Sequence, residues 1–246
     1  MLALAGPLRH AGLLTNRATI RAAIQGLQFS TLGFTEGQTQ RAVRNMGDAV
    51  RGLEAAKVRR VADRAVPRVV GPRVYPEALD LIVWHRRNGH LVFLVSASTR
   101  DLIDRLGEMV GADGVVASEA EIIDGRYSGA VSLCHGAAKA MAIRRLAEAH
   151  GIDLHRSYAY GDAEGDIPML RAVGHPTAVN ADRRLRAAAR RQGWPQLRFH
   201  APERQLELDA HGQLAGNRGS APNPILDALE PAPPEVQVDG AGTSAY

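Results

Sequence analysis

The chain has 246 residues, enough for one domain of ordinary size and a smaller module, and 45% of them are hydrophobic. This composition excludes disorder of the whole chain. The formal net charge of +4 is uneven, because seven acids and two arginines give residues 201–246 a net charge of −5 and leave +9 on the first 200. The arginines of this basic body alternate with Asp, Glu and Ala rather than with aromatic residues, which favours solvated helix faces over a nucleic-acid site.

Nothing in the sequence indicates secretion or a membrane span. The chain has one cysteine, Cys134, so it forms no internal disulfide. Its first fourteen residues lack a basic stretch ahead of the apolar ones and are interrupted by Pro7 and Arg9, which argues against a signal peptide. No stretch approaches the ~18 apolar residues that a membrane helix needs. We therefore expect a cytoplasmic protein that binds neither a membrane nor nucleic acid.

The N-terminal third of the chain shows helical periodicity. Between residues 17 and 70 the apolar residues recur at spacings of three and four, with breaks at Gly33 and Gly52. The pattern predicts three or four short helices without a strand. After Gly71-Pro72 a further amphipathic helix is expected over 76–87, opened by a proline at its start and ended by Asn-Gly.

From residue 91 onward, short apolar segments alternate with helical ones, and an Asp124-Gly125 pair predicts a hairpin within 122–131. Repeated β-α units of this kind predict an α/β fold with a mostly parallel, doubly wound sheet. The expected strands are 91–98, 114–118, 157–162, 177–180 and 197–200, and the expected helices are 100–110, 137–150, 167–172 and 182–192. Residues 201–246 hold six of the thirteen prolines and predict a disordered acidic tail.

Ligands of open parallel sheets lie beyond the carboxyl ends of the strands, so the residues that follow each apolar segment are the first candidates for a site. Ser96 follows the apolar residues of 91–95, and hydroxyl and backbone N–H groups at such a strand-to-helix turn can hold phosphate. The alternative is that the serines and Thr99 only cap the next helix.

Lys139 and a Gly-Asp-x-x-x-Asp segment are the other two candidates. Lys57 and Lys139 are the only lysines among thirty basic residues, which suggests a site for a compact ammonium group, although an ordinary exposed lysine is the alternative. Asp162 and Asp166 lie where a strand turns into a helix, and their carboxylates are the hard oxygen ligands that Mg²⁺ prefers. Alternatively, Asp166 only caps the helix that contains Pro168.

Taken in order, these features resemble the motifs of the haloacid dehalogenase (HAD) superfamily, and in particular its phosphoserine-phosphatase-like branch, subfamily IB. The resemblance rests on VSAS (95–98), DGRYSG (124–129), GAAKAMAIRRL (136–146) and the long segment 160–194. It covers residues 1 to about 200. It implies a helical cap at 1–68 followed by an α/β core at 69–200.

The resemblance implies a magnesium-dependent phosphatase that forms an aspartyl-phosphate and acts on a small phosphate ester. Ser96, Ala97 and Lys139 would bind the phosphate, with Ser96 and Lys139 acting in catalysis. Asp162 and Asp166 would hold Mg²⁺ directly or through water.

One departure from the family pattern affects catalysis. The family's nucleophile lies in an Asp-x-Asp motif after the first core strand, whereas no two aspartates of this chain are separated by a single residue. We therefore expect the first core strand to be missing and the 246 residues to be a truncated, inactive form. The alternative is a noncatalytic remnant that binds phosphate or a partner. The sequence indicates neither the substrate nor the oligomeric state.

Overall fold

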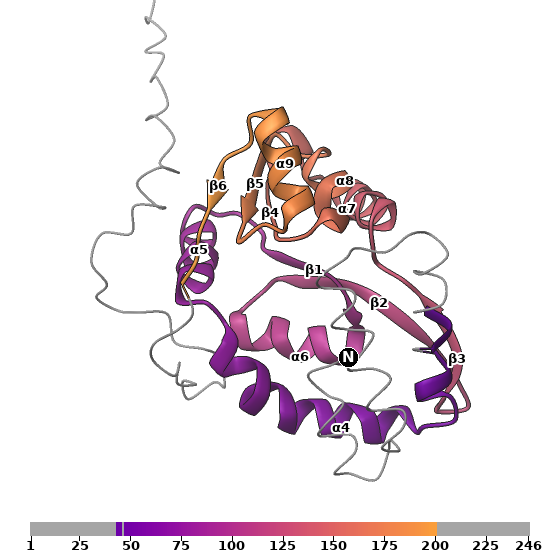
Figure 1. Ribbon diagram of the computed structural model, residues 1–246. Helices are drawn as coiled ribbons and strands as arrows, with labels where there is room; N and C mark the ends of the chain where they lie inside the picture. Colours follow the sequence, from indigo (N-terminus) through magenta and orange to yellow (C-terminus); the bar gives the residue numbers. More distant parts are fainter. Residues whose placement is uncertain (1–42, 46, 201–246) are drawn as a thin grey trace, which may run out of the picture.

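The computed structural model describes residues 43–45 and 47–200 (Figure 1). Most of the predicted N-terminal helices and the acidic tail lie outside the described residues. Within them the strands form two three-stranded sheets, with orders β1-β2-β3 and β4-β5-β6. Helices and sheets of this kind confirm the predicted α/β class. No described helix is long and apolar enough to span a membrane.

The first sheet is mixed. Strand β1 (Phe93–Thr99) lies parallel to β2 (Gly114–Ile123), which then pairs antiparallel with β3 (Arg126–Ser132). Asp124 and Gly125 connect β2 to β3 with φ angles of 49° and 74°, the left-handed conformations that a two-residue hairpin turn requires. The predicted hairpin is therefore confirmed. Strand β2 is longer than expected because it continues from one partner strand to the next.

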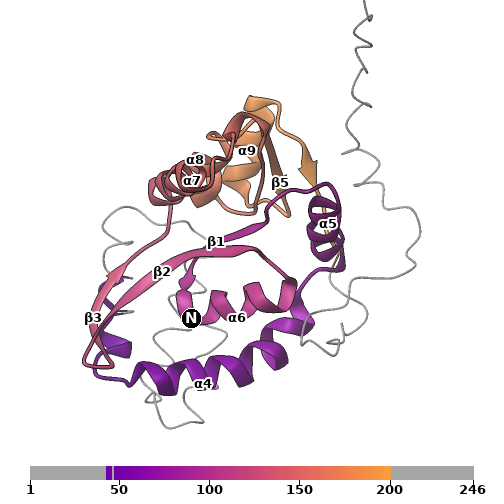
Figure 2. The same cartoon turned by 180° about the vertical axis from the view of Figure 1, so that it is seen from behind.

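Helices α4 (Ala55–Ala65) and α6 (Arg100–Val110) cover one side of this sheet, as Figures 1 and 2 both show. A π-helical turn (Val66–Val70) and a 3₁₀ turn (Gly71–Arg73) follow α4. The apolar faces of α4 and α6 enter one hydrophobic cluster with residues of β2 and β3. Its members are Val50, Ala55, Val58, Ala62, Ala65, Val66, Leu79, Leu102, Ile103, Met109, Ala117 and Tyr127. The predicted boundary near residue 68 between a cap and a core stays a prediction.

The second sheet is parallel throughout and contains β4 (Tyr158–Gly161), β5 (His175–Val179) and β6 (Gln196–Leu197). Helices α7 (Ala137–His150), α8 (Ile167–Leu170) and α9 (Arg183–Gln192) lie with it in the same half of the molecule (Figure 1). Two further 3₁₀ turns, Leu154–Arg156 and Glu164–Asp166, flank β4. The strands and the α-helices of this half lie within two residues of their predicted bounds, except that β6 ends three residues early.

The described strands form a mixed sheet and a parallel sheet, and no hydrogen-bonded ladder joins β1 to β4. Each of these strands has a strand partner on one side only among the described residues. The absence of a first core strand stays a prediction, since residues 1–42 lie outside the description. Strand β1 also begins two residues later than predicted, because Val92 exchanges hydrogen bonds with Asp113 instead of joining the ladder.

Helix α5 (Pro76–Arg87) connects the two halves. It starts with Pro76 in its first turn and ends at Asn88 and Gly89, as predicted. Although α5 precedes β1 in the chain, it packs on the second sheet, where Leu81 lies against Val179 and Phe199. Its buried His85 places Nε2 2.9 Å from the Tyr160 hydroxyl of β4 and Nδ1 2.9 Å from Nδ1 of His90.

We expect acid to weaken this docking of α5. Burial and, to a smaller extent, the neighbouring His90 lower the pKa of His85 to about 4, whereas an unfolded histidine has a pKa of about 6.5. The unfolded chain therefore binds the proton first, and the free energy of unfolding should fall as the pH decreases from 6.5 to 4. Urea denaturation of the wild type and of His85→Gln at pH 7 and pH 5 measures this. The difference in the free energy of unfolding between pH 7 and pH 5 should shrink in His85→Gln and persist in His155→Gln. An unchanged difference in His85→Gln would contradict the role of this histidine.

Candidate active site

A buried ion pair lies at the centre of the candidate site. Lys139, in the first turn of α7, places Nζ 2.5 Å from Oδ1 of Asp166, and the two side chains are 10% and 6% exposed. The same ammonium group donates to the carbonyl oxygen of Val95 at 3.3 Å. Lys139 is therefore not an ordinary exposed lysine, and it contacts both β1 and the loop after β4. An ion pair at this depth requires good geometry to offset desolvation of both charges.

Asp166 folds back over the loop that precedes it. Its Oδ2 accepts hydrogen bonds from the backbone N–H groups of Asp162 (3.0 Å) and Ala163 (3.2 Å). It makes no side-chain bond to the N–H groups of α8, but its bond to Ala163 caps the 3₁₀ turn Glu164–Asp166 that leads into α8, so the capping alternative holds in part. A side chain at Gly161 would collide with the Asp166 carboxylate, which explains why glycine precedes Asp162. Asp166 thus fixes both the loop and the lysine.

Asp162 lies at the tip of this loop and is partly open to solvent. Burial of its carboxylate raises its pKa, and the neighbouring charge of Asp166 raises it further. A second aspartate, Asp182, holds the loop from the other side. Its backbone N–H donates to the Asp162 carbonyl oxygen at 2.8 Å, and its carboxylate accepts from the N–H of Glu164 at 2.9 Å.

Sequence reasoning did not identify Asp182 as a residue of the site. Its side chain also accepts from the N–H of Leu185 at 2.7 Å, which makes it the N-cap of α9. The sequence signal was an aspartate directly before a helical segment, which is typical of a cap and says nothing of the loop it also binds.

The predicted phosphate-binding residues lie within β1 rather than after it, where the ladder with β2 is irregular between Val95 and Thr99. Ser96 is half-buried, and its Oγ accepts from the N–H of Ser98 at 3.1 Å rather than capping α6. Thr99 occupies the N-cap position without a side-chain cap bond. Ser96 directly follows Val95, whose carbonyl contacts Lys139. The structure therefore brings the middle of β1 next to the ion pair.

Ala97 is fixed by Ser118, which the sequence analysis did not single out. The Ser118 hydroxyl is fully buried, donates to the Ala97 carbonyl oxygen at 2.8 Å and accepts from the N–H of Cys134 at 3.0 Å. These two bonds tie β1, β2 and the start of the segment that leads to α7. The backbone of β1 at Ala97 is thus fixed by a hydrogen bond from a buried hydroxyl.

Cys134 and His135 complete the surroundings and were not predicted. Burial raises the pKa of the Cys134 thiol, so this cysteine is unsuited to act as a nucleophile. Burial lowers the pKa of His135, and the charge of Lys139 lowers it further. The His135 ring lies against Gly165, where a side chain would collide with it. The second glycine of the loop therefore makes room for this histidine.

The chemistry of these groups suits a phosphate with a divalent cation. One ammonium group and the backbone of a strand-to-helix turn can bind an anion. Asp162 and Asp166 supply hard oxygen atoms, but the described residues contain no group of three or more His, Cys, Asp or Glu that could hold a metal. This donor set fits Mg²⁺, which typically binds one or two carboxylates and takes its other oxygens from water and phosphate.

Comparison with known proteins identifies the family. The family model of haloacid dehalogenase-like hydrolases matches residues 6–171. A probable phosphatase of Mycobacterium tuberculosis is 37% identical over 202 residues, which cover 82% of this chain and 70% of that protein. The phosphoserine phosphatase SerB1 of the same species is 30% identical over 70% of this chain and 57% of its own length.

A solved structure supports the same assignment of the fold. A substrate-bound phosphoserine phosphatase shares the fold with a TM-score of 0.55 at 22% identity, over 75% of this chain and 82% of that chain. The sequence and structural neighbours thus include phosphoserine phosphatases, as the motifs predicted. The chain belongs to the haloacid dehalogenase-like hydrolases.

Proposed function

We propose that the described residues form the phosphate- and magnesium-binding part of a phosphatase site for a small phosphate ester. The observation that carries this proposal is the buried Lys139–Asp166 pair, which contacts Val95 within β1 and lies in the loop after the carboxyl end of β4. Apolar residues could replace an ion pair that serves only to stabilise a fold. The position of this pair, beside Ser96 and the Asp162–Asp166 loop, favours a role in binding instead. Phosphatase names among the relatives support the reaction class.

Each residue has a distinct part in this proposal. Lys139 neutralises the phosphoryl oxygens, and its charge is oriented beforehand by Asp166, so no reorganisation is needed as the transition state forms. The Ser96 hydroxyl and the Ala97 N–H donate to the phosphate. Asp162 is the direct carboxylate ligand of the cation. Asp166, already bonded to Lys139 and to two N–H groups, acts on the cation through water.

The magnesium ion would supply charge neutralisation of the phosphate when bound. These assignments leave the nucleophile unaccounted for, because none of the residues named above is free to attack phosphorus. The resemblance implies an aspartate in an Asp-x-Asp motif, which the 246 residues do not contain. Hydrolysis therefore requires a strand ending in that motif, and we propose that the 246 residues alone are inactive. Magnesium dependence and a cytoplasmic location are part of the same proposal.

Metal titration tests the assignment of Asp162. With Mn²⁺ as a spectroscopically visible substitute for Mg²⁺ at pH 7.5, Asp162→Asn should weaken cation binding by about tenfold or more, because it removes the direct ligand. Asp63→Asn on the exposed side of α4 is the matched control and should bind as the wild type does. Equal binding by Asp162→Asn and the wild type would show that the cation does not bind at this loop.

A further inference from the structure

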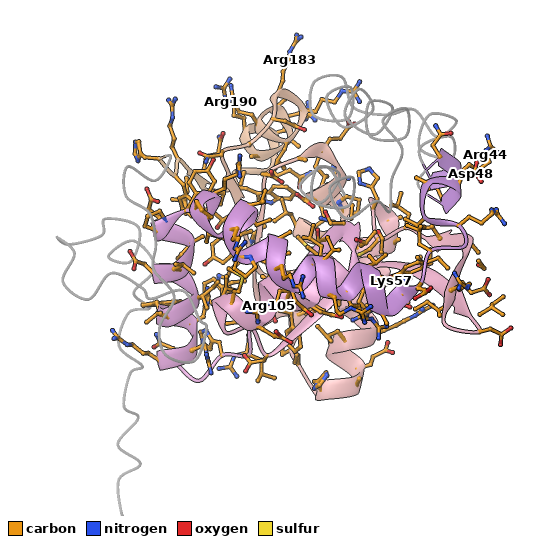
Figure 3. The ribbon with its side chains drawn as sticks, turned by 90° about the horizontal axis from the view of Figure 1, so that it is seen from below. Arg44, Asp48, Lys57, Arg105, Arg183 and Arg190 are labelled. Carbon is orange, nitrogen blue, oxygen red and sulfur yellow. The ribbon has the colours of Figure 1, made fainter. Side chains whose placement is uncertain are left out.

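Helix α9 carries a face made almost wholly of arginine. The helix Arg183–Gln192 contains five arginines and no acidic residue, and its buried side is formed by Leu185, Ala188 and Ala189. At 3.6 residues per turn the arginines fall on one side of the helix, opposite the buried residues. Figure 3 shows Arg183 and Arg190 extending outward from this helix. The five residues, here called the α9 arginine face, are Arg183, Arg184, Arg186, Arg190 and Arg191.

The charge of this face is poorly compensated. Arg184 pairs with Glu164 at 2.6 Å, and Arg186 donates to the Ala181 carbonyl oxygen at 2.8 Å. Within the part of the chain that the structure describes, no carboxylate forms an ion pair with Arg183, Arg190 or Arg191.

Two features of α9 make this charge unfavourable by itself. Like charges three and four residues apart repel one another along the helix. Arg183 and Arg184 in the first turn also oppose the helix dipole, whereas Arg190 and Arg191 in the last turn are favoured by it. A negatively charged partner would relieve both effects.

The acidic segment 201–246 of the same chain has the charge and the position to be that partner. It carries a net charge of −5 against +9 on the rest of the chain. It follows His200, three residues after β6, and β6 pairs with β5, against which α9 packs. A segment of this length can span a distance on the order of 40 Å. Helix α9 is about 15 Å long.

We propose that residues 201–246 bind the α9 arginine face through salt-sensitive, rapidly exchanging ion pairs. Each exposed pair contributes little, but tethering raises the effective concentration of the acidic groups to roughly millimolar. Because Arg184 also contacts Glu164 in the Asp162–Asp166 loop, the bound segment lies beside the candidate site and reduces its attraction for anions. This inference does not depend on the proposed phosphatase activity.

Paramagnetic relaxation in the full chain tests it. A spin label is attached to Cys in the variant Ser220→Cys, combined with Cys134→Ser to remove the native thiol. At about 0.02 M NaCl the amide signals of α9 should broaden more than those of α4, and at about 0.5 M NaCl they should recover because salt screens the pairs. A mixture of two proteins, one carrying only the isotope label and the other carrying only the spin label, reports contacts between copies.

Two matched charge variants complete the test. Removing three charges with Arg183→Gln, Arg190→Gln and Arg191→Gln should abolish the broadening. Removing three exposed charges with Arg60→Gln, Arg64→Gln and Arg68→Gln should leave it unchanged. Absence of salt-sensitive broadening at α9, equal loss in both triple variants, or broadening that arises only between copies would each overturn the proposal.

Discussion

Replacing Lys139 with Ala should lower phosphatase activity by ~10²–10³ in an N-terminally extended form that supplies the Asp-x-Asp strand. The buried ammonium group is held 2.5 Å from Asp166 and 3.3 Å from the Val95 carbonyl, so it is oriented before substrate binds. Its loss removes a preorganised charge from the transferring phosphoryl group. The effect should appear mainly in kcat, because the charge on the phosphoryl oxygens changes most in the transition state.

Lys57 is the natural control, since it is the only other lysine and forms an exposed pair with Glu54 at 2.9 Å. Lys57→Arg should retain the activity of the parent. Removing Lys139 also leaves Asp166 as an uncompensated buried charge, which typically costs about 3–5 kcal/mol of stability. The double variant Lys139→Ala with Asp166→Asn should recover part of that stability without recovering activity. Comparable activities of Lys139→Ala and Lys57→Arg would contradict the assignment.

Residues 1–246 alone should show no magnesium-dependent turnover of a generic phosphate ester. Lys139 is paired with Asp166, Asp162 is assigned to the cation, and Ser96 accepts a backbone hydrogen bond without a described base beside it. Burial raises the pKa of Cys134, which removes the thiolate as a substitute nucleophile. Direct attack by water would need a positioned base, and the family's acid/base aspartate belongs to the same Asp-x-Asp motif as the nucleophile.

The measurement is a side-by-side assay of the 246 residues and the N-terminally extended form with Mg²⁺. The extended form should turn over substrate, and the shorter one should remain at the level of the buffer. A folded spectrum for both proteins is the required control, because β1 and β4 each pair with one strand only among the described residues and a domain is stable by only roughly 5–15 kcal/mol. Equal turnover by both would show that another group in the chain attacks phosphorus.

The sequence predicts helix ends and tight turns well, because both depend on residues that are adjacent in the chain. Pro76 and Asn88-Gly89 set the bounds of α5, and Asp124-Gly125 made the hairpin, as predicted. Ser96 and Asp162 stand out because each follows apolar residues of an expected strand, and Lys139 stands out because it is one of only two lysines. The structure brings Lys139 and Asp166 together from segments 27 residues apart.

Other features depend on contacts between distant segments, which the pattern of one segment does not contain. Ser118 appeared only as the last residue of a strand, yet its hydroxyl bonds both Ala97 and Cys134. The His135 ring against Gly165 had no sequence signal, because neither residue belongs to a periodic pattern.

Titration of inorganic phosphate into the 246-residue protein with Mg²⁺ tests the central assignment most directly, because binding needs no nucleophile. The wild type and Lys57→Met should bind phosphate with the same affinity. The double variant Lys139→Met with Asp166→Asn removes both charges of the buried pair, so that neither is left uncompensated, and it should bind phosphate at least about tenfold more weakly. Calorimetry at pH 7.5 with and without Mg²⁺ provides the affinities. Equal, magnesium-dependent phosphate binding by all three proteins would contradict a phosphate site built on Lys139.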